Sequence, residues 1–200
     1  MTWLRRQFES VGLTQHPAGK HLSKVQDRFG GSVILCLDVS GSMSGSPLTQ
    51  AVVGCRRFIE EAHEAHYKVG LVFWNHAVES HVEVTKETKP LLALLQRARA
   101  TGGTNILPTL ALAEQELAGR EGDRVVAIFG DGDLGNARKA ADAAQRLRAQ
   151  DIRIITCGLG ISSAESLGAI ADEEELNVAA NDTISESIAA MAGGLKRRNR

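Results

Sequence analysis

Four short runs of apolar residues, rich in β-branched side chains, limit most strongly how this chain can fold. A strand exposed on one face alternates polar and apolar residues, whereas a strand buried on both faces is apolar along its length. The runs therefore predict parallel strands at the centre of a sheet that is covered on both sides. They are residues Val33–Leu37, Val69–Phe73, Val125–Phe129 and Ile152–Cys157.

Apolar residues at helical spacing lie between and after these runs. Pro47 suits the first turn of a helix, and Ser46 before it is the expected N-cap. Because parallel strands need long crossovers, and the joining stretches have room for helices, we expect a three-layer, doubly wound α/β sheet. The stripes are Val52, Cys55, Ile59 and Ala62; Ala137, Ala140, Ala141, Ala144 and Leu147; and Ile184, Ile188, Met191 and Leu195.

The segment Ala77–Val84 predicts a different kind of strand. Its valines, Val78, Val82 and Val84, are interleaved with charged and polar residues, as in a strand with one exposed face. The segment follows the run ending near Trp74 at hairpin spacing. We therefore predict one antiparallel edge strand in an otherwise mostly parallel sheet.

Residues 1–31 lie outside this alternation of strands and helices. Two apolar patterns at helical spacing, separated by Pro17, predict an N-terminal helical extension at 1–31, followed by one domain at 32–200. We expect the extension to pack on that domain. An arm that docks on another protein is the alternative.

Composition excludes several classes of protein. The chain has 200 residues and is 43% hydrophobic, which is enough for one sizeable core. Its formal charge of -1 gives no overall field toward nucleic acid or anionic lipid, so we expect neither as a partner. The longest apolar run is far shorter than the roughly 20 residues of a membrane span, and no signal-peptide core is evident near the start.

The cysteines indicate a reducing compartment. Cys36, Cys55 and Cys157 are widely spaced, odd in number and set in apolar surroundings. Neither a disulfide framework nor a zinc knuckle fits that pattern. We therefore expect a cytoplasmic location.

A polar loop, Asp38-Val39-Ser40-Gly41-Ser42, begins where the first predicted strand ends. Ligand sites in open α/β sheets lie at the carboxyl ends of strands. Carboxylate and hydroxyl oxygens suit Mg²⁺, Mn²⁺ or Ca²⁺ better than zinc or copper. The loop therefore indicates a cation site, and the alternative is a polar turn that only caps the next helix.

Two further loops bring oxygen atoms to the same edge of the predicted sheet. Asp131-Gly132-Asp133 follows the strand that ends near Phe129, and Thr101–Asn105 precedes a helix expected near Pro108. We expect the three loops to converge. For Asp133 we favour a cap on the helix that begins near Asn136; holding a water near the metal or repelling an acidic partner are alternatives.

These three loops resemble the metal-ion-dependent adhesion site, or MIDAS, of von Willebrand factor A domains, in an intracellular type. The resemblance rests on Asp38, Ser40 and Ser42, on Gly-Gly-Thr-Asn with Thr104, and on Asp131 before a glycine, and it covers roughly residues 32–195. It implies a Rossmann-like fold, one divalent cation and protein binding rather than catalysis. Mg²⁺ is the expected ion, with Mn²⁺ and Ca²⁺ as alternatives.

The resemblance also implies the metal site. Its residues are Asp38, Ser40, Ser42, Thr104 and Asp131. The two carboxylates neutralise the charge of the cation and the hydroxyls add none, so the ion stays attractive to a further anionic oxygen. The expected partner is another protein, whose Glu or Asp side chain completes the metal shell.

A Mg²⁺-dependent phosphohydrolase is the alternative function, with Asp38 as its nucleophile. Such chemistry commonly uses a second carboxylate two residues later, where this chain has Ser40, and no lysine near the motifs is placed to stabilise phosphate. We therefore expect no enzymatic activity and no catalytic residue. His63 and His66 are interpreted as solvated helix residues rather than zinc ligands.

The C-terminal helical stripe raises one expectation about motion. In related A domains this helix slides when the metal site changes its coordination, and Gly193 and Gly194 weaken its last turns here. A static helix that only covers the sheet is the favoured interpretation.

Overall fold

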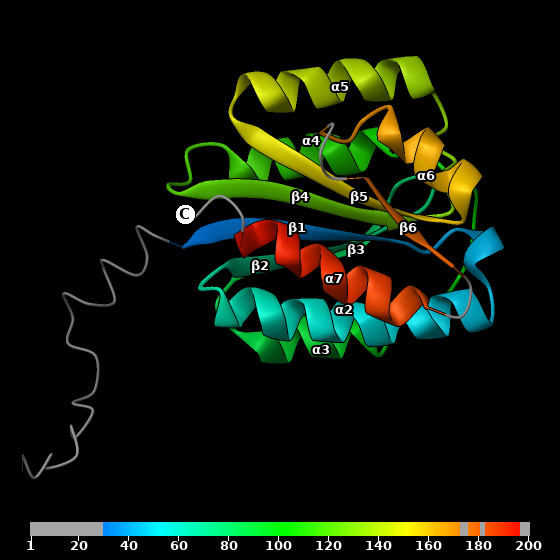
Figure 1. Ribbon diagram of the computed structural model, residues 1–200, viewed down its shortest axis with the longest axis horizontal. Helices are drawn as coiled ribbons and strands as arrows, with labels where there is room; N and C mark the ends of the chain where they lie inside the picture. Colours follow the sequence, from blue (N-terminus) through cyan, green and yellow to red (C-terminus); the bar gives the residue numbers. More distant parts are fainter. Residues whose placement is uncertain (1–29, 173–175, 181–182, 197–200) are drawn as a thin grey trace, which may run out of the picture.

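Six strands form one mixed sheet in the computed structural model, which describes residues 30–172, 176–180 and 183–196 (Figure 1). Their order across the sheet is β3-β2-β1-β4-β5-β6. The strands are β1 (Gly31–Asp38), β2 (Lys68–Trp74), β3 (Val78–Thr85), β4 (Asp123–Gly130), β5 (Ile152–Leu159) and β6 (Leu176–Ala179).

The four predicted central strands are confirmed, and so is the edge strand. Strand β3 pairs antiparallel with β2 at one edge of the sheet. All the other neighbouring pairs are parallel: β2-β1, β1-β4, β4-β5 and β5-β6. Side chains of β1 show why its apolar run is continuous: Val33 and Leu35 enter the core on one face, and Ile34 enters the core on the other. The strand is buried throughout.

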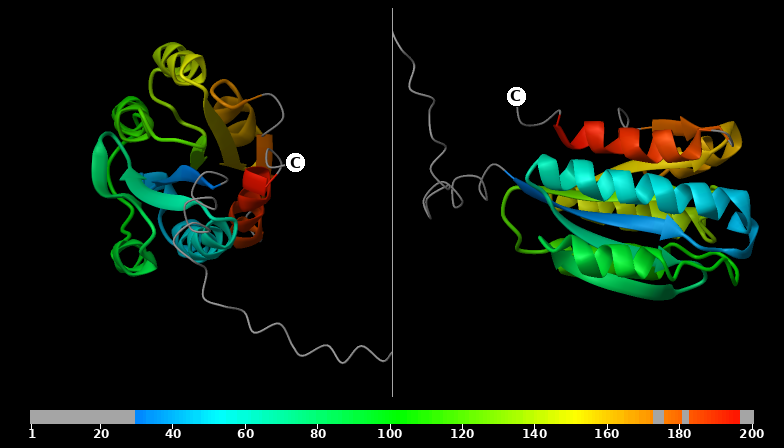
Figure 2. Two further views of the ribbon diagram at one scale, coloured as in Figure 1. Left: turned by 90° about the vertical axis from the view of Figure 1, so that its left-hand side faces the viewer. Right: turned by 90° about the horizontal axis from the view of Figure 1, so that it is seen from below.

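Helices cover both faces and complete the three-layer, Rossmann-like fold (Figure 2). On one face lie α2 (Ser46–Glu64), α3 (Thr88–Leu95) and α7 (Ile184–Lys196); on the other lie α4 (Leu107–Leu117), α5 (Ala137–Ala149) and α6 (Ile161–Gly168). Strand β6 and helices α3 and α6 have no counterpart among the predicted elements, because each is only four to eight residues long and carries little periodic signal.

The structure corrects two details of the predicted helices. Ser46 is the first residue of α2 rather than its N-cap; Gly45 occupies the cap position with a positive φ of 84°. In α5 the buried face runs through Ala140, Ala143, Ala144 and Leu147, so Ala137 of the predicted stripe is exposed. The α7 stripe is confirmed, since Ile184, Ile188, Met191 and Leu195 are all buried.

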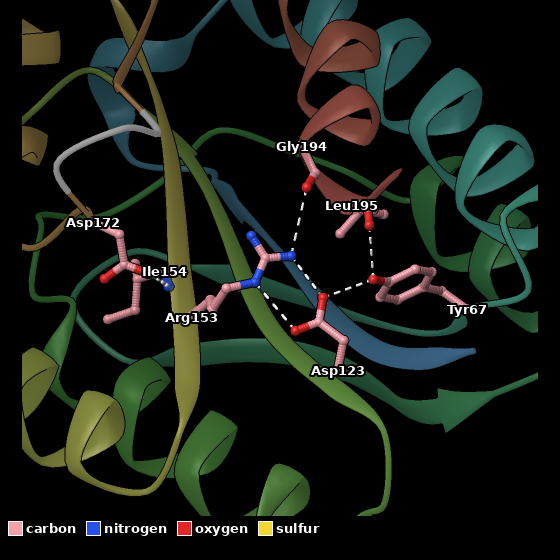
Figure 3. A network of polar contacts seen from close by, with 7 residues as sticks. All are labelled: Tyr67, Asp123, Arg153, Ile154, Asp172, Gly194 and Leu195. Carbon is pink, nitrogen blue, oxygen red and sulfur yellow. Dashed lines mark hydrogen bonds and ion pairs between the residues drawn. The ribbon is translucent and has the colours of Figure 1, made fainter. Parts of the chain in front are cut away.

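A partly buried polar cluster holds the end of α7 against the amino ends of the strands (Figure 3). Arg153 donates from Nε to Asp123 Oδ1 at 3.1 Å and from Nη2 to Asp123 Oδ2 at 2.6 Å. The Tyr67 hydroxyl lies 2.6 Å from Asp123 Oδ2 and 2.9 Å from the carbonyl oxygen of Leu195. This Tyr67–Asp123–Arg153 cluster therefore joins β4, β5 and α7 at the edge opposite the loops after β1 and β4.

The predicted helical extension falls on residues 1–29, which are outside the described residues, and β1 begins at Gly31. The basic C-terminal residues 197–200 are likewise outside them. Within the part of the chain that the structure describes, no helix is long and apolar enough to cross a membrane.

Candidate metal centre

The predicted loops converge at the carboxyl edge of the sheet. Ser42 Oγ donates a hydrogen bond to Asp131 Oδ2, although the two residues are 89 positions apart. Ser40 Oγ lies 3.0 Å from Ser42 Oγ, and the Asp131 amide donates to Asp38 Oδ2 at 3.4 Å. Four of the five predicted site residues therefore form one hydrogen-bonded group.

Asp38 ends β1 with its side chain fully buried. Its Oδ1 accepts a hydrogen bond of 2.8 Å from the Ser40 amide. The pKa of Asp38 is raised from its ordinary 3.8 to about 6, chiefly by burial and less by the nearby charge of Asp131, although hydrogen bonds from Ser40 and Asp131 oppose the shift. The site is therefore a place where added positive charge stabilises a carboxylate.

Gly130 at the end of β4 makes room for the Asp38 carboxylate. A Cβ at this position would lie 2.9 Å from Asp38 Oδ2 and 3.1 Å from Asp38 Cβ. It would also lie 3.1 Å from Cζ2 of the buried Trp74. The absence of a side chain at Gly130 is thus part of how the site is built.

The loop that carries Thr104 is attached to the first loop through its backbone. The Thr101 amide donates to the Val39 carbonyl at 2.8 Å, and the Gly41 amide donates to the Gly102 carbonyl at 3.1 Å. Among the described residues, no hydrogen bond joins the Thr104 hydroxyl to the other four predicted ligands. The structure therefore places the Thr104 loop beside the site without tying its hydroxyl to the group.

Asn75 positions this loop and was not among the predicted site residues. Its side chain is fully buried; Nδ2 donates to the Thr101 carbonyl at 3.1 Å, and Oδ1 accepts from the Ala77 amide at 3.1 Å. Its carbonyl accepts from the Asn105 amide at 2.7 Å. An amide residue directly after an apolar strand run was the only sequence signal, and it resembles an ordinary turn residue.

The helix-cap role predicted for Asp133 is wrong. Asn136 is the N-cap of α5, and its side chain accepts a hydrogen bond of 3.0 Å from the Lys139 amide. Asp133 is exposed and accepts from the Gly135 amide at 2.8 Å. This hydrogen bond stabilises the turn before the helix, in which Gly135 has a positive φ of 72°.

The two histidines differ from the prediction that both are solvated helix residues. His63 is half-buried, its Nδ1 lies 3.0 Å from Thr88 Oγ1, and burial lowers its pKa. His66 is exposed, as predicted, but it lies beyond the end of α2 with a φ of 64°. Among the described residues no group of three or more His, Cys, Asp or Glu side chains is arranged for a metal.

The family profile described as von Willebrand factor type A domain matches residues 33–136, which is more than half of the chain. The chain therefore belongs to the von Willebrand factor type A domain family. The matched segment contains all three loops of the candidate site. A search of curated protein sequences found no match.

Solved structures with the same fold include two pilus proteins and a matrix protein. The vWF domain of the type V pili tip protein Mfa5 from Porphyromonas gingivalis has a TM-score of 0.74 and 14% identity, over 86% of this chain and 97% of that one. The pilus adhesin SpaC from Lactobacillus rhamnosus GG has a TM-score of 0.70 and 12% identity, over 84% and 30%.

The matrix protein is proximal thread matrix protein 1 from the mussel byssus, in a structure described as having a zinc-occupied MIDAS motif. It has a TM-score of 0.67 and 14% identity, over 83% of this chain and 46% of that one. At these identities the likeness establishes the fold. The chain spans less than half of SpaC and of the mussel protein.

Proposed function

We propose that this chain is a protein-interaction module of intracellular type whose binding depends on one divalent cation at a MIDAS. We propose that the cation is Mg²⁺. The residues that would hold it are Asp38, Ser40, Ser42, Thr104 and Asp131. The observation that carries the proposal is the group of carboxylate and hydroxyl oxygens joined through the Ser42–Asp131 and Ser40–Ser42 contacts.

The donor set fits a hard cation. Adjacent oxygen ligands of an octahedral Mg²⁺ lie about 3 Å apart, because each metal–oxygen bond is about 2.1 Å. Ser40 Oγ and Ser42 Oγ are 3.0 Å apart. Asp38 and Asp131 supply two negative charges, and the space left by Gly130 lets the Asp38 carboxylate occupy the site.

A bound cation would supply an attraction for an anionic oxygen, and this chain's residues would determine its strength. Serine and threonine hydroxyls coordinate without adding charge, so two carboxylates only balance a divalent ion. We propose that a Glu or Asp side chain of a partner protein completes the shell. The zinc-occupied MIDAS of the mussel matrix protein supports metal binding on this fold.

The same geometry argues against the alternative phosphohydrolase. The Asp38 carboxylate is fully buried, with Oδ1 facing the Ser40 amide and Oδ2 facing the Asp131 amide. A nucleophile needs a free oxygen to reach a phosphorus atom, and both oxygens of this carboxylate are already held by backbone amides. We propose that the module is not an enzyme and expect no metal-dependent hydrolysis of phosphate esters.

We also propose a cytoplasmic location, supported by the cysteines. All three are free and buried. A reducing compartment keeps such thiols unpaired. Fractionation of the source cell tests this proposal directly, and recovery from an extracellular fraction would contradict it.

Calorimetry with MgCl₂ and MnCl₂ tests the metal site. Wild type should bind one cation, and Asp38→Ala and Ser40→Ala should lose binding. Ser44→Ala should retain it, because among the described residues no hydrogen bond joins the Ser44 side chain to the site. Thermal unfolding of each variant would verify that the fold is intact. Unchanged affinity in folded Asp38→Ala protein would show that the assignment is wrong.

Partner binding is tested separately by affinity capture from the source cell, with Mg²⁺ or with EDTA. A protein retained only with the metal and only by chains with an intact Asp38 would support the proposed function. Retention that is indifferent to both would contradict it.

A further inference from the structure

Two adjoining hollows lie between the edge strand β3 and helix α3. One has a volume of about 380 Å³ and the other about 170 Å³. Both are lined by Ser80, Leu94 and Arg97, so we treat them together and call them the arginine channel. The volumes suit side chains of an extended segment better than a whole helix.

Two irregularities in the pairing of β3 flank the channel residues Ser80 and Val82. The pairing of β3 with β2 shifts between Phe73 and Trp74 and again between Val69 and Leu71. Such bulges re-aim the side chains between them. Ser80 and Val82 both line the channel, and Leu94 of α3, only 8% exposed, adds an apolar surface.

Two arginines give the channel its charge. Arg97 borders both hollows, Arg99 borders the smaller one, and both residues are exposed. Arg99 Nη1 donates to the Ala98 carbonyl at 2.7 Å, and neither guanidinium forms an ion pair with another residue that the structure describes. Glu79 is the carboxylate that lines the channel, so the two cations outnumber it.

The smaller hollow of the channel borders the loop that carries Thr104. Thr101 lines its smaller hollow, and the Thr101 amide is bonded to the Val39 carbonyl of the first site loop at 2.8 Å. Thr104 is three residues further on, a distance of at most roughly 10 Å along an extended chain. A peptide held at the metal could therefore enter the channel within a few residues.

We propose that the arginine channel is a second anchor for the metal-bound partner. An extended segment of the partner places one carboxylate on the metal, an apolar side chain against Leu94, and a second acidic side chain against Arg97 and Arg99. Charge complementarity selects this occupant, because an apolar floor beside unpaired cations favours an acidic peptide that also carries apolar residues. The inference rests on the proposed metal function.

The probe is a peptide selected from a random library displayed on phage. The selection uses the full chain in Mg²⁺ as its target. We expect the recovered peptides to carry two acidic positions a few residues apart with an apolar residue between them. A synthetic copy of a recovered peptide is then measured by fluorescence anisotropy. If Mg²⁺ selects no such peptides, the inference is wrong.

The deciding comparison uses the double variant Arg97→Glu with Arg99→Glu. It should bind the peptide roughly tenfold more weakly or worse, since two exposed charge pairs are lost and reversed. The matched control is Arg56→Glu with Lys89→Glu, which makes the same charge change at exposed residues outside the channel. Replacing the second acidic residue of the peptide by lysine should restore binding to the channel variant and weaken binding to wild type.

The outcomes separate the two proposals. Equal peptide affinity in the channel variant and wild type, with binding still lost in EDTA, overturns this inference and leaves the metal function standing. Binding that survives EDTA but requires Arg97 and Arg99 overturns the metal function and the two-anchor arrangement. A dimer of the free chain that dissociates in the channel variant would assign the channel to a second copy and overturn the peptide assignment.

Discussion

Ser42, on the loop after β1, donates a hydrogen bond to Asp131, on the loop after β4, across 89 positions of sequence. The sheet explains the contact: β1 and β4 are parallel neighbours, so their carboxyl ends open on the same edge. The contact brings the two halves of the proposed metal site together. Its energetic weight can be measured one residue at a time.

Ser42→Ala should weaken Mg²⁺ binding by roughly tenfold or more, because it removes a proposed ligand and releases Asp131. Calorimetry gives the affinity directly. Ser44→Ala, on the same loop but without a described side-chain hydrogen bond to the site, should bind like wild type. Similar losses in both variants would mean that the loop, and not the Ser42 hydroxyl, supports the site.

Gly130→Ala should damage the metal site through Asp38. The added methyl group would lie 2.9 Å from Asp38 Oδ2, so the carboxylate must move. We expect weaker Mg²⁺ binding in a protein that still unfolds cooperatively. Gly103→Ala is the matched control, since a Cβ there meets no atom within 4 Å. A Gly130→Ala protein with wild-type Mg²⁺ affinity would contradict this account of the site.

Metal affinity should rise with pH through the titration of Asp38. Its pKa in the folded, metal-free protein is about 6, and the cation must displace the proton. At about pH 5 roughly one tenth of the Asp38 side chains are ionised, so Mg²⁺ should bind roughly tenfold more weakly there than above about pH 7. Calorimetry across this range tests the expectation, and a flat profile would refute it.

The free energy of unfolding should follow the opposite trend without metal. The folded pKa of Asp38 lies above its ordinary 3.8, so between these values the folded protein holds more protons than the unfolded chain. The stability contributed by protonated Asp38 is therefore present at low pH and is lost as pH rises toward about 6. Denaturant titrations of Asp38→Asn should lose this component, whereas Asp133→Asn, at an exposed turn residue, should keep it.

The parts of the fold that the sequence revealed are those with a repeated pattern. Strands buried on both faces have no polar positions, and a long helix such as α7 repeats its apolar stripe for three turns. Helix α3 has eight residues, and its buried leucines Leu91, Leu94 and Leu95 cover only about one turn. A stripe that short is not distinguished from a chance run of apolar residues.

The residues of the candidate site likewise divide into those with a local sequence signal and those whose role depends on contacts between loops. Asp38, Ser40 and Ser42 are close in sequence, and the end of a strand fixes where they lie. Asn75 acts by holding the Thr101 carbonyl, a contact that depends on two loops meeting in space. The role of Asp133 was mistaken because Asn136, three residues later, satisfies the helix end first.

Asp123→Asn should destabilise the fold much more than loss of a surface ion pair. Its partner Arg153, whose side chain is 15% exposed, would lose its carboxylate partner in a largely buried place, at a cost of about 1–3 kcal/mol. Arg57→Ala, which breaks the exposed Arg57–Glu186 pair, should cost less than about 1 kcal/mol. Denaturant unfolding measures both, and equal effects would show that the Asp123–Arg153 pair is not a structural anchor.

Helix α7 should stay in place when the metal binds. The Tyr67 hydroxyl and Arg153 contact the carbonyl oxygens of Leu195 and Gly194 in its last turn, at 2.9 Å and 3.5 Å. At Gly54 of α2 the two helices approach so closely that an added Cβ would lie 2.8 Å from Ile188 Cβ. Sliding by one turn would break the carbonyl contacts and move Ile188 out of this close fit.

Hydrogen exchange tests whether α7 is static. With Mg²⁺ the amides of residues 38–44 and 130–135 should gain protection, while those of α7 should exchange as they do in EDTA. Tyr67→Phe is the internal check, because removing one anchor should speed exchange in the last turn of α7 with or without metal. A change in α7 protection that follows metal binding in wild type would instead identify the helix as a two-state element biased by the site.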